Sequence, residues 1–283
     1  MNIHEWPLVI FTVLCQSAVG AFLWCMIALC TGNLNTQQRT KLNRVMFLIW
    51  ALVGVALALS TMHLGMPFRA ANALTRTGQA PLSNEIISLS AFAGLGFIYW
   101  LMSLRKPEGC GAGMVLAALT AIAGLVFIWA MSNVYRIPTV PMWNTPMTCL
   151  AFSATAMICG SALAAFLLSA SDAAHKPLLR YGPLAIATVG AIATIVVMVT
   201  QYADLANMQN APLRDIPVLL KTLICFQSSR FVLLLIGLLI WGWQAARTKQ
   251  SAGVMLLVSI LLILAEMIGR LVFYSLNMTV GLI

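Results

Sequence analysis

The sequence predicts an all-α integral membrane protein with eight transmembrane helices. Of its 283 residues, 61% are hydrophobic and only 8% are charged, and its mean hydropathy is +0.94. Soluble domains carry about 25% charged residues, so the solvent for most of this chain is lipid. No stretch shows the alternating pattern of an outer-membrane barrel strand. Helices are then the structure that pairs every backbone group inside a bilayer.

Eight apolar stretches each have about 20 residues or more, which is enough to cross a hydrocarbon core of about 30 Å. We therefore expect residues 1–283 to form one transmembrane helical domain. The predicted spans, in order, are 7–31, 45–66, 85–104, 114–134, 147–170, 183–202, 227–246 and 252–277.

Polar segments separate these spans. After the first, third, fifth and seventh spans come 31–44 (T-G-N-L-N-T-Q-Q-R-T-K-L-N-R), 105–111 (R-K-P-E-G-C-G), 171–180 (S-D-A-A-H-K-P-L-L-R) and 247–250 (R-T-K-Q). The second, fourth and sixth spans are followed by 60–85, 137–146 and 203–223. The first span begins directly after an N-terminus with no basic region and no cleavage site, so we expect no signal peptide to be removed.

Basic residues are divided unequally between the two sets of connections. The first set carries nine: Arg39, Lys41, Arg44, Arg105, Lys106, Lys176, Arg180, Arg247 and Lys249. The second set carries five, counting Arg136 directly before 137–146: Arg69, Arg76, Arg136, Arg214 and Lys221. The positive-inside rule places the first set in the cytoplasm, so both termini are expected outside it. The same distribution between apolar runs argues that the net charge of +9 serves topology and not nucleic-acid binding.

The residue pattern argues against a metal or haem site in this protein. The seven cysteines include no C-x-x-C pair, so neither a zinc site nor an iron–sulfur cluster is expected. Of the three histidines, only His63 lies near membrane depth. A bis-histidine haem would need a second such residue.

The hairpin 60–85 concentrates the polar groups that could carry chemistry. His63 closes the second span; its imidazole could bond a quinone carbonyl or take a proton from a quinol, or could simply bond a neighbouring helix. Glu85 opens the third span on the same membrane face, as a proton acceptor or as a first-turn carboxylate beside the capping residues Ser83 and Asn84. Arg69 could hold an oxygen of the same ligand, pair with Glu85 or contact lipid phosphate.

Three further ionisable residues lie near or within later spans. Glu266 and Arg270 are one helical turn apart, which predicts an internal ion pair of mainly structural value. Tyr274 follows at the next turn and could extend this polar stripe. Arg230, near the predicted start of the seventh span, is expected to reach outward to the interface.

Several long motifs resemble the membrane-anchor, quinol-oxidising subunit of the bacterial dimethyl sulfoxide reductase family. The likeness covers nearly the whole chain and is strongest in five segments: His4–Val13, Met62–Asn72, Leu82–Ile86, Thr139–Trp143 and Glu266–Gly281.

The resemblance implies an anchor of eight helices with both termini periplasmic, in the bacterial inner (cytoplasmic) membrane. Such anchors hold a molybdopterin catalytic subunit and a four-cluster iron–sulfur subunit, and they carry no haem. They oxidise menaquinol and pass its electrons to the iron–sulfur partner in anaerobic respiration. The family's site histidine matches His63, its site glutamate matches Glu85, and Arg69 is a weaker match.

The function expected from residues and resemblance together is menaquinol oxidation within an S-oxide or N-oxide reductase complex. This subunit would not be catalytic alone, since it would bind menaquinol or menaquinone but hold no redox centre. The alternatives are a helical transporter, which would show broken spans and a central polar path, and a purely structural anchor without quinol chemistry.

Overall fold

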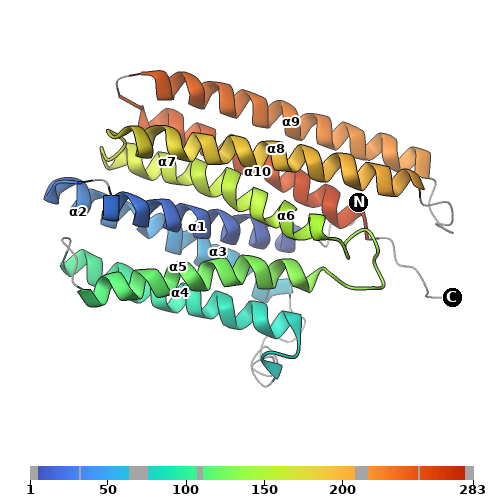
Figure 1. Cartoon of the computed structure of the whole chain (residues 1–283), viewed down its shortest axis with the longest axis horizontal. Helices are drawn as coiled ribbons and strands as arrows, with labels where there is room; N and C mark the ends of the chain where they lie inside the picture. The colour runs from blue at the N-terminus through green and yellow to red at the C-terminus, as the bar shows by residue number, and fades with distance from the viewer. Residues whose placement is uncertain are drawn as a thin grey trace.

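The described part of the protein is a bundle of long helices that lie nearly side by side, as the computed structural model shows (Figure 1). It covers residues 6–31, 33–63, 76–106, 111–207, 216–247 and 249–277, without the side chains of 62–63, 206–207 and 216–220. These residues form helices and no strand: α1 (Trp6–Thr31), α2 (Thr36–Val45), α3 (Phe47–His63), α4 (Pro81–Arg105), α5 (Gly111–Val134), α6 (Pro146–Thr155), η3 (Ala156–Gly160), α7 (Ser161–Ala170), α8 (Pro177–Asn207), α9 (Ile216–Ala246) and α10 (Ala252–Ser275).

Eight helical segments of the described residues are long and apolar enough to cross a membrane, which confirms the predicted fold class. The second of these joins α2 to α3, and the fifth joins α6, η3 and α7. Because the spans alternate in direction, α1 begins and α10 ends at the same end of the bundle (Figure 1). We call the end where α1, α4, α7 and α9 finish the basic end, and the end where α3, α5, α8 and α10 finish the far end.

Several helices extend beyond the spans expected from hydropathy. The second span becomes helical at Thr36, because α2 is a polar helix that precedes the apolar run. Its first turn is fixed by a capping box: Asn35 Oδ1 accepts from the Gln38 N–H (2.8 Å) and Gln38 Oε1 accepts from the Asn35 N–H (3.1 Å). Likewise α8 begins at Pro177 and α9 at Ile216. Hydropathy detects the lipid-facing part of a helix and misses such polar extensions.

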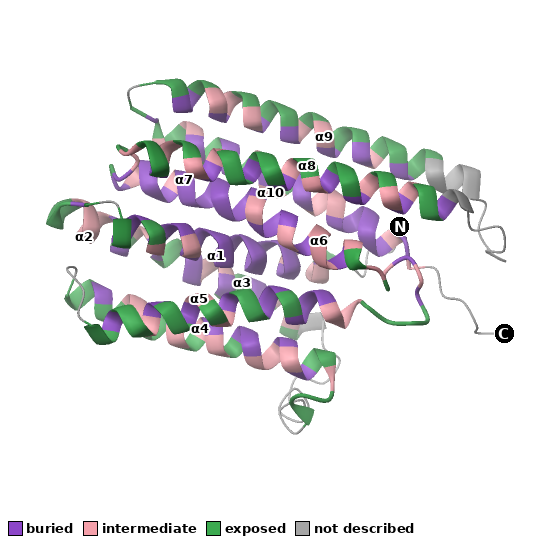
Figure 2. Ribbon diagram, viewed as in Figure 1, coloured by how far each residue is buried: buried purple, intermediate pink, exposed green. Residues whose placement is uncertain are grey.

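Helix α1 is the centre of the bundle, and the outer helices face lipid. In its most apolar window 83% of the residues are buried, against 28% for the windows in α4, α8 and α9. Figure 2 shows the same contrast as a buried α1 between helices with exposed outer stripes. Those stripes carry large apolar side chains such as Met114, Val199 and Leu239. Such stripes are stable against lipid and would aggregate in water.

A π-helical turn brings α1 unusually close to the fifth span. Gly20 of α1 faces Gly160, the last residue of η3, and a Cβ on Gly160 would lie 2.5 Å from the Gly20 Cα. A Cβ on Gly20 would in turn overlap the Ala156 carbonyl oxygen. Backbone atoms cannot move aside as a flexible side chain can, so this contact requires glycine on both helices.

The basic end is held by Asp172, in the turn between α7 and α8. Lys41 donates to its Oδ2 (2.8 Å), and Lys249 lies 3.1 Å from its Oδ1. The hydrogen bond from Lys41, then that from Lys249, holds the pKa of this carboxyl below its usual range. Gln38 also donates to the Asp172 backbone carbonyl (2.7 Å). The contacts join α2, the α7–α8 turn and the segment before α10.

Replacing Gly160 with alanine is expected to destabilise the protein by about 1–3 kcal/mol, because the added methyl has no space against α1. The matched control is Gly94→Ala on α4, where nothing lies within 4 Å of the added carbon. Alanine there should be neutral or slightly stabilising, since it favours the helix. Thermal unfolding of the purified variants in detergent measures both. Equal stability of the two variants would contradict the close α1–η3 contact.

Candidate functional site

The candidate site lies at the far end, where α3 finishes and α4 begins. His63 is the last residue of α3, so its backbone stands at this end of the bundle, but its side chain is outside the described residues. Arg69 also lies outside the described residues. Glu85 is the predicted site residue whose surroundings the structure describes.

Glu85 lies inside the bundle and not at a helix cap. Helix α4 begins at Pro81, with Ala80 as N-cap and no side-chain capping bond, so Glu85 belongs to the second turn. The interpretation of Glu85 as a first-turn residue capped by Ser83 or Asn84 is therefore wrong. Asn84 instead accepts from the Gly78 N–H (2.7 Å), which fixes the preceding turn. Gly78 has φ +81°, a conformation that favours glycine.

The Glu85 side chain is buried but incompletely paired. The residue is 6% exposed, and its Oε1 is buried with no hydrogen-bond partner among the described residues. An unpaired buried carboxylate oxygen is costly because it has lost its hydrogen bonds to water. Nearly all buried polar atoms therefore have a partner. It can accept a hydrogen bond from a ligand or receive a proton.

Glu85 shares its electrostatic surroundings with three residues from other parts of the bundle. These are Cys15 of α1, Tyr135 just after α5, and Tyr274 of α10. The two tyrosine hydroxyls are hydrogen-bonded to each other at 2.7 Å. Tyr274 is the residue that sequence reasoning placed at the end of a polar stripe on α10, and here the stripe joins α10 to the end of α5.

Aromatic rings support the tyrosine pair. Trp143 stacks on Phe273 with ring centroids 5.3 Å apart, and its Nε1 donates to the Phe273 carbonyl (2.9 Å). Tyr135 packs edge-on against both rings. The segment between α5 and α6 is thereby fixed on α10, which closes this part of the bundle with rigid aromatic side chains.

Deeper in the bundle, Glu266 of α10 binds Arg230 of α9. Arg230 Nη2 and Nε donate to Glu266 Oε1 at 2.7 and 3.1 Å, and Thr155 Oγ1 donates to Oε2 at 2.6 Å. Arg230 is 7% exposed and Glu266 1%. The expectation that Arg230 reaches outward to the interface is wrong, because α9 begins at Ile216 and so carries Arg230 into the interior.

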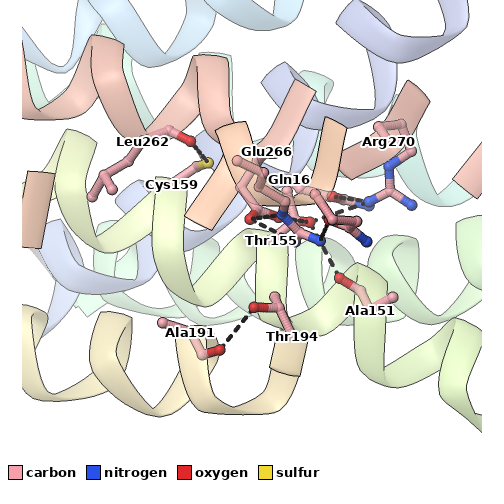
Figure 3. Close-up of polar contacts among 11 residues, drawn as sticks. Gln16, Ala151, Thr155, Cys159, Ala191, Thr194, Leu262, Glu266 and Arg270 are labelled. Atoms are coloured by element: carbon pink, nitrogen blue, oxygen red, sulfur yellow. Dashed lines mark hydrogen bonds and ion pairs between the residues drawn. The ribbon is translucent and has the colours of Figure 1, made fainter. Parts of the chain in front are cut away.

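Arg270 does not pair directly with Glu266 among the described contacts. The prediction of an ion pair between Glu266 and Arg270 is therefore wrong. Its Nη2 donates to Gln16 Oε1 (3.0 Å) and to Thr155 Oγ1 (3.3 Å), as Figure 3 shows. Its guanidinium carbon lies 3.6 Å from the centre of the Phe152 ring, a close cation–π contact. Thr155 is thus the bridge between Arg270 and the Glu266 carboxylate.

We call Gln16, Thr155, Arg230, Glu266 and Arg270 the buried polar cluster. Sequence reasoning did not single out Gln16 or Thr155. Each is a polar residue within an apolar span, and such residues usually face the bundle interior. The position of Gln16 and Thr155 within apolar spans was therefore the sequence signal that could have identified them.

The buried polar cluster carries two cations and one anion, which leaves one positive charge in excess. Arg270 Nε also lacks a hydrogen-bond partner among the described residues. Tyr135 and Tyr274 interact electrostatically with both Arg270 and Glu85. The excess positive charge of Arg270 favours negative charge in its vicinity.

Within the described ranges, no group of three or more His, Cys, Asp or Glu residues has the arrangement of a metal site. The absence of haem and of an iron–sulfur cluster from the whole protein stays a prediction.

Comparison with known proteins shows which sequences this protein is similar to. A sequence model of the family described as DMSO reductase anchor subunit (DmsC) matches residues 1–276. The anaerobic dimethyl sulfoxide reductase protein YnfH of Escherichia coli K12 is 39% identical over 283 residues, covering 99% of this sequence and 97% of the relative. The C subunit of the anaerobic dimethyl sulfoxide reductase of the same strain is 37% identical, with coverage of 99% and 97%. The C subunit of the Haemophilus influenzae enzyme is 34% identical, with coverage of 99% and 98%.

Replacing Glu266 with alanine is expected to destabilise the protein by about 3–5 kcal/mol, because two buried arginines lose their counter-charge. Thermal unfolding in detergent is the measurement. The control is Asp172→Asn, which removes the solvent-exposed ion pairs with Lys41 and Lys249, tolerates the positive φ of 56° at this position and should cost about 1 kcal/mol or less. Glu266→Ala with the stability of the Asp172 variant would contradict the described pairing.

Proposed function

The protein belongs to the DMSO reductase anchor subunit family, and on that premise we propose that it oxidises menaquinol at its far end. As a family member it is a multi-pass membrane protein that anchors a reductase with catalytic and electron-transfer subunits. The observation that carries the proposal is the buried Glu85 Oε1 without a described partner, at the bundle end where α3 finishes at His63.

Oxidation of a quinol releases two electrons and two protons. In the proposed site Glu85 Oε1 accepts a hydrogen bond from one quinol hydroxyl and then its proton. His63 bonds or deprotonates the other hydroxyl, and Arg69 holds an oxygen of the same ring. The Glu85 carboxylate is suited to this work because its unpaired oxygen is open to a new donor, whereas both oxygens of Glu266 are already occupied.

The buried polar cluster, deeper in the bundle than Glu85, supports this chemistry electrostatically. A quinol that gives up its first proton is an anion, and its charge is costly in lipid. Arg270 supplies positive charge that Glu266 and Gln16 do not fully offset, and the tyrosine pair interacts electrostatically with both Arg270 and Glu85. The cluster thus stabilises negative charge at the site without contacting the ligand.

Electrons leave to a four-cluster iron–sulfur subunit, since this subunit is proposed to hold no redox centre of its own. A molybdopterin catalytic subunit then uses two electrons and two protons to reduce an S-oxide or N-oxide, releasing water. In the inner membrane, with both termini periplasmic, the far end faces the periplasm. Protons from menaquinol are then released on that side.

The depth of Arg230, Glu266 and Arg270 is the observation that favours the alternative class, a helical transporter. Against it, these residues bind one another and neighbouring side chains. Flux of an ion through proteoliposomes without quinol would support the transporter. An anchor without quinol chemistry is distinguished by the two variants below.

His63→Ala is expected to lower the rate of quinol-analogue oxidation by the assembled complex by about 100-fold or more, because a proton acceptor is removed. The rate is normalised to the amount of assembled complex in the membrane. The control is His175→Ala, in the α7–α8 turn at the basic end, which should leave the rate unchanged. A normal rate for His63→Ala would remove the histidine from the mechanism and favour a structural anchor.

Glu85→Gln is expected to slow turnover while a quinone-site inhibitor still binds, because the amide keeps the shape of the carboxyl but cannot take a proton. Inhibitor binding and the quinol-oxidation rate are measured on the same preparation. Asp172→Asn, at the opposite end of the bundle, is the matched carboxylate control. Full activity of Glu85→Gln would show that this carboxylate carries no proton.

A further inference from the structure

A cavity of about 640 Å³ opens at the basic end, away from the proposed quinol site. It lies between α1, α2, α4 and α5, and most of its lining is apolar. Its size lies within the range of ligand pockets, which is about 300–1,000 Å³.

The lining changes character along the bundle axis. Three basic residues stand at the mouth: Arg39 on α2, Arg105 at the end of α4, and Lys106 directly after it. Apolar residues continue inward to Ala121 of α5, which is ten residues, or about 15 Å, from the helix start at Gly111. No aspartate or glutamate is among the described residues of the lining.

The positive charge at the mouth is partly fixed in place. Arg39 donates from Nη2 to the Leu29 carbonyl (2.9 Å) and from Nε to the Leu34 carbonyl (3.3 Å), so its guanidinium is anchored to the end of α1. Arg105 and Lys106 are exposed and have no described carboxylate partner.

The lining also contains an unsatisfied acceptor. Asn43 is 2% exposed and uses its Nδ2 to bond the Ser103 carbonyl (3.2 Å), but its Oδ1 is buried without a partner among the described residues. If the amide were turned over, a polar atom would still be unpaired. A hydroxyl group in the cavity would satisfy it.

We propose that this cavity is a binding site for an anionic phospholipid whose headgroup carries a glycerol hydroxyl. The phosphate lies among Arg39, Arg105 and Lys106, the hydroxyl bonds Asn43, and the acyl chains follow the apolar lining into the bilayer. Basic pockets between transmembrane helices bind anionic headgroups in this manner. A quinone would match the apolar depth but would leave the three cations without a counter-charge among the described residues.

The test uses the assembled complex, washed free of lipid in detergent and offered dioleoyl phosphatidylglycerol or dioleoyl phosphatidylcholine at equal concentration. Native mass spectrometry counts the bound lipids. The double variant Arg105→Gln/Lys106→Gln is expected to weaken phosphatidylglycerol binding about 10- to 30-fold. Arg39 is kept, because it also holds the end of α1.

Two further variants make the result decisive. Arg44→Gln/Arg247→Gln removes the same charge from the basic end outside the cavity and should retain binding. Ala118→Trp fills the lipid-facing side of the cavity without changing its charge, and this variant should lose phosphatidylglycerol binding. Unchanged phosphatidylglycerol binding in both cavity variants, equal loss in the charge control, or a quinone as the retained molecule would each overturn the proposal.

Discussion

Inside a bilayer no water is available to a polar side chain, so each buried charge must be stabilised by the protein itself. In this protein the Glu266 carboxylate meets that requirement for four helical segments at once. Arg230 reaches it from α9, Thr155 from α6, and Thr155 and Gln16 then hold Arg270 beside α1. This set of bonds connects α1 to α6 and α10, and connects α10 in turn to α9.

The two buried glutamates, Glu266 and Glu85, differ in whether both carboxylate oxygens have hydrogen-bond donors among the described residues. Glu266 has a donor on each oxygen and is therefore fixed. Glu85 is similarly buried, yet one of its oxygens has no described partner. A saturated carboxylate stabilises a fold, whereas an unsaturated one is available to a ligand.

The eight-helix fold followed from the sequence because apolar length is a property of each segment alone. Family motifs in the sequence pointed to the same anchor family that the comparisons show. The pairing of charges could not be predicted in the same way. Glu266 and Arg270 are neighbours along α10, so helical spacing favoured a bond between them. The partner of Glu266 is on α9, and the position of Arg230 depended on a helix start eleven residues before the expected one. Helix ends that lie in polar sequence carry no hydropathy signal, and cross-helix partners are set by packing.

The π-helical turn at Ala156–Gly160 has a consequence for the second half of its span. A turn of this kind holds one more residue than an α-helical turn, and one residue corresponds to about 100° of rotation. Helix α7 is therefore rotated about the helix axis relative to a regular α-helical continuation of α6. Deleting a single residue there would restore regular winding and turn the side chains that now meet α1 and α10 away from those helices. The length of this short segment, as much as its composition, specifies which surface the span presents to its neighbours.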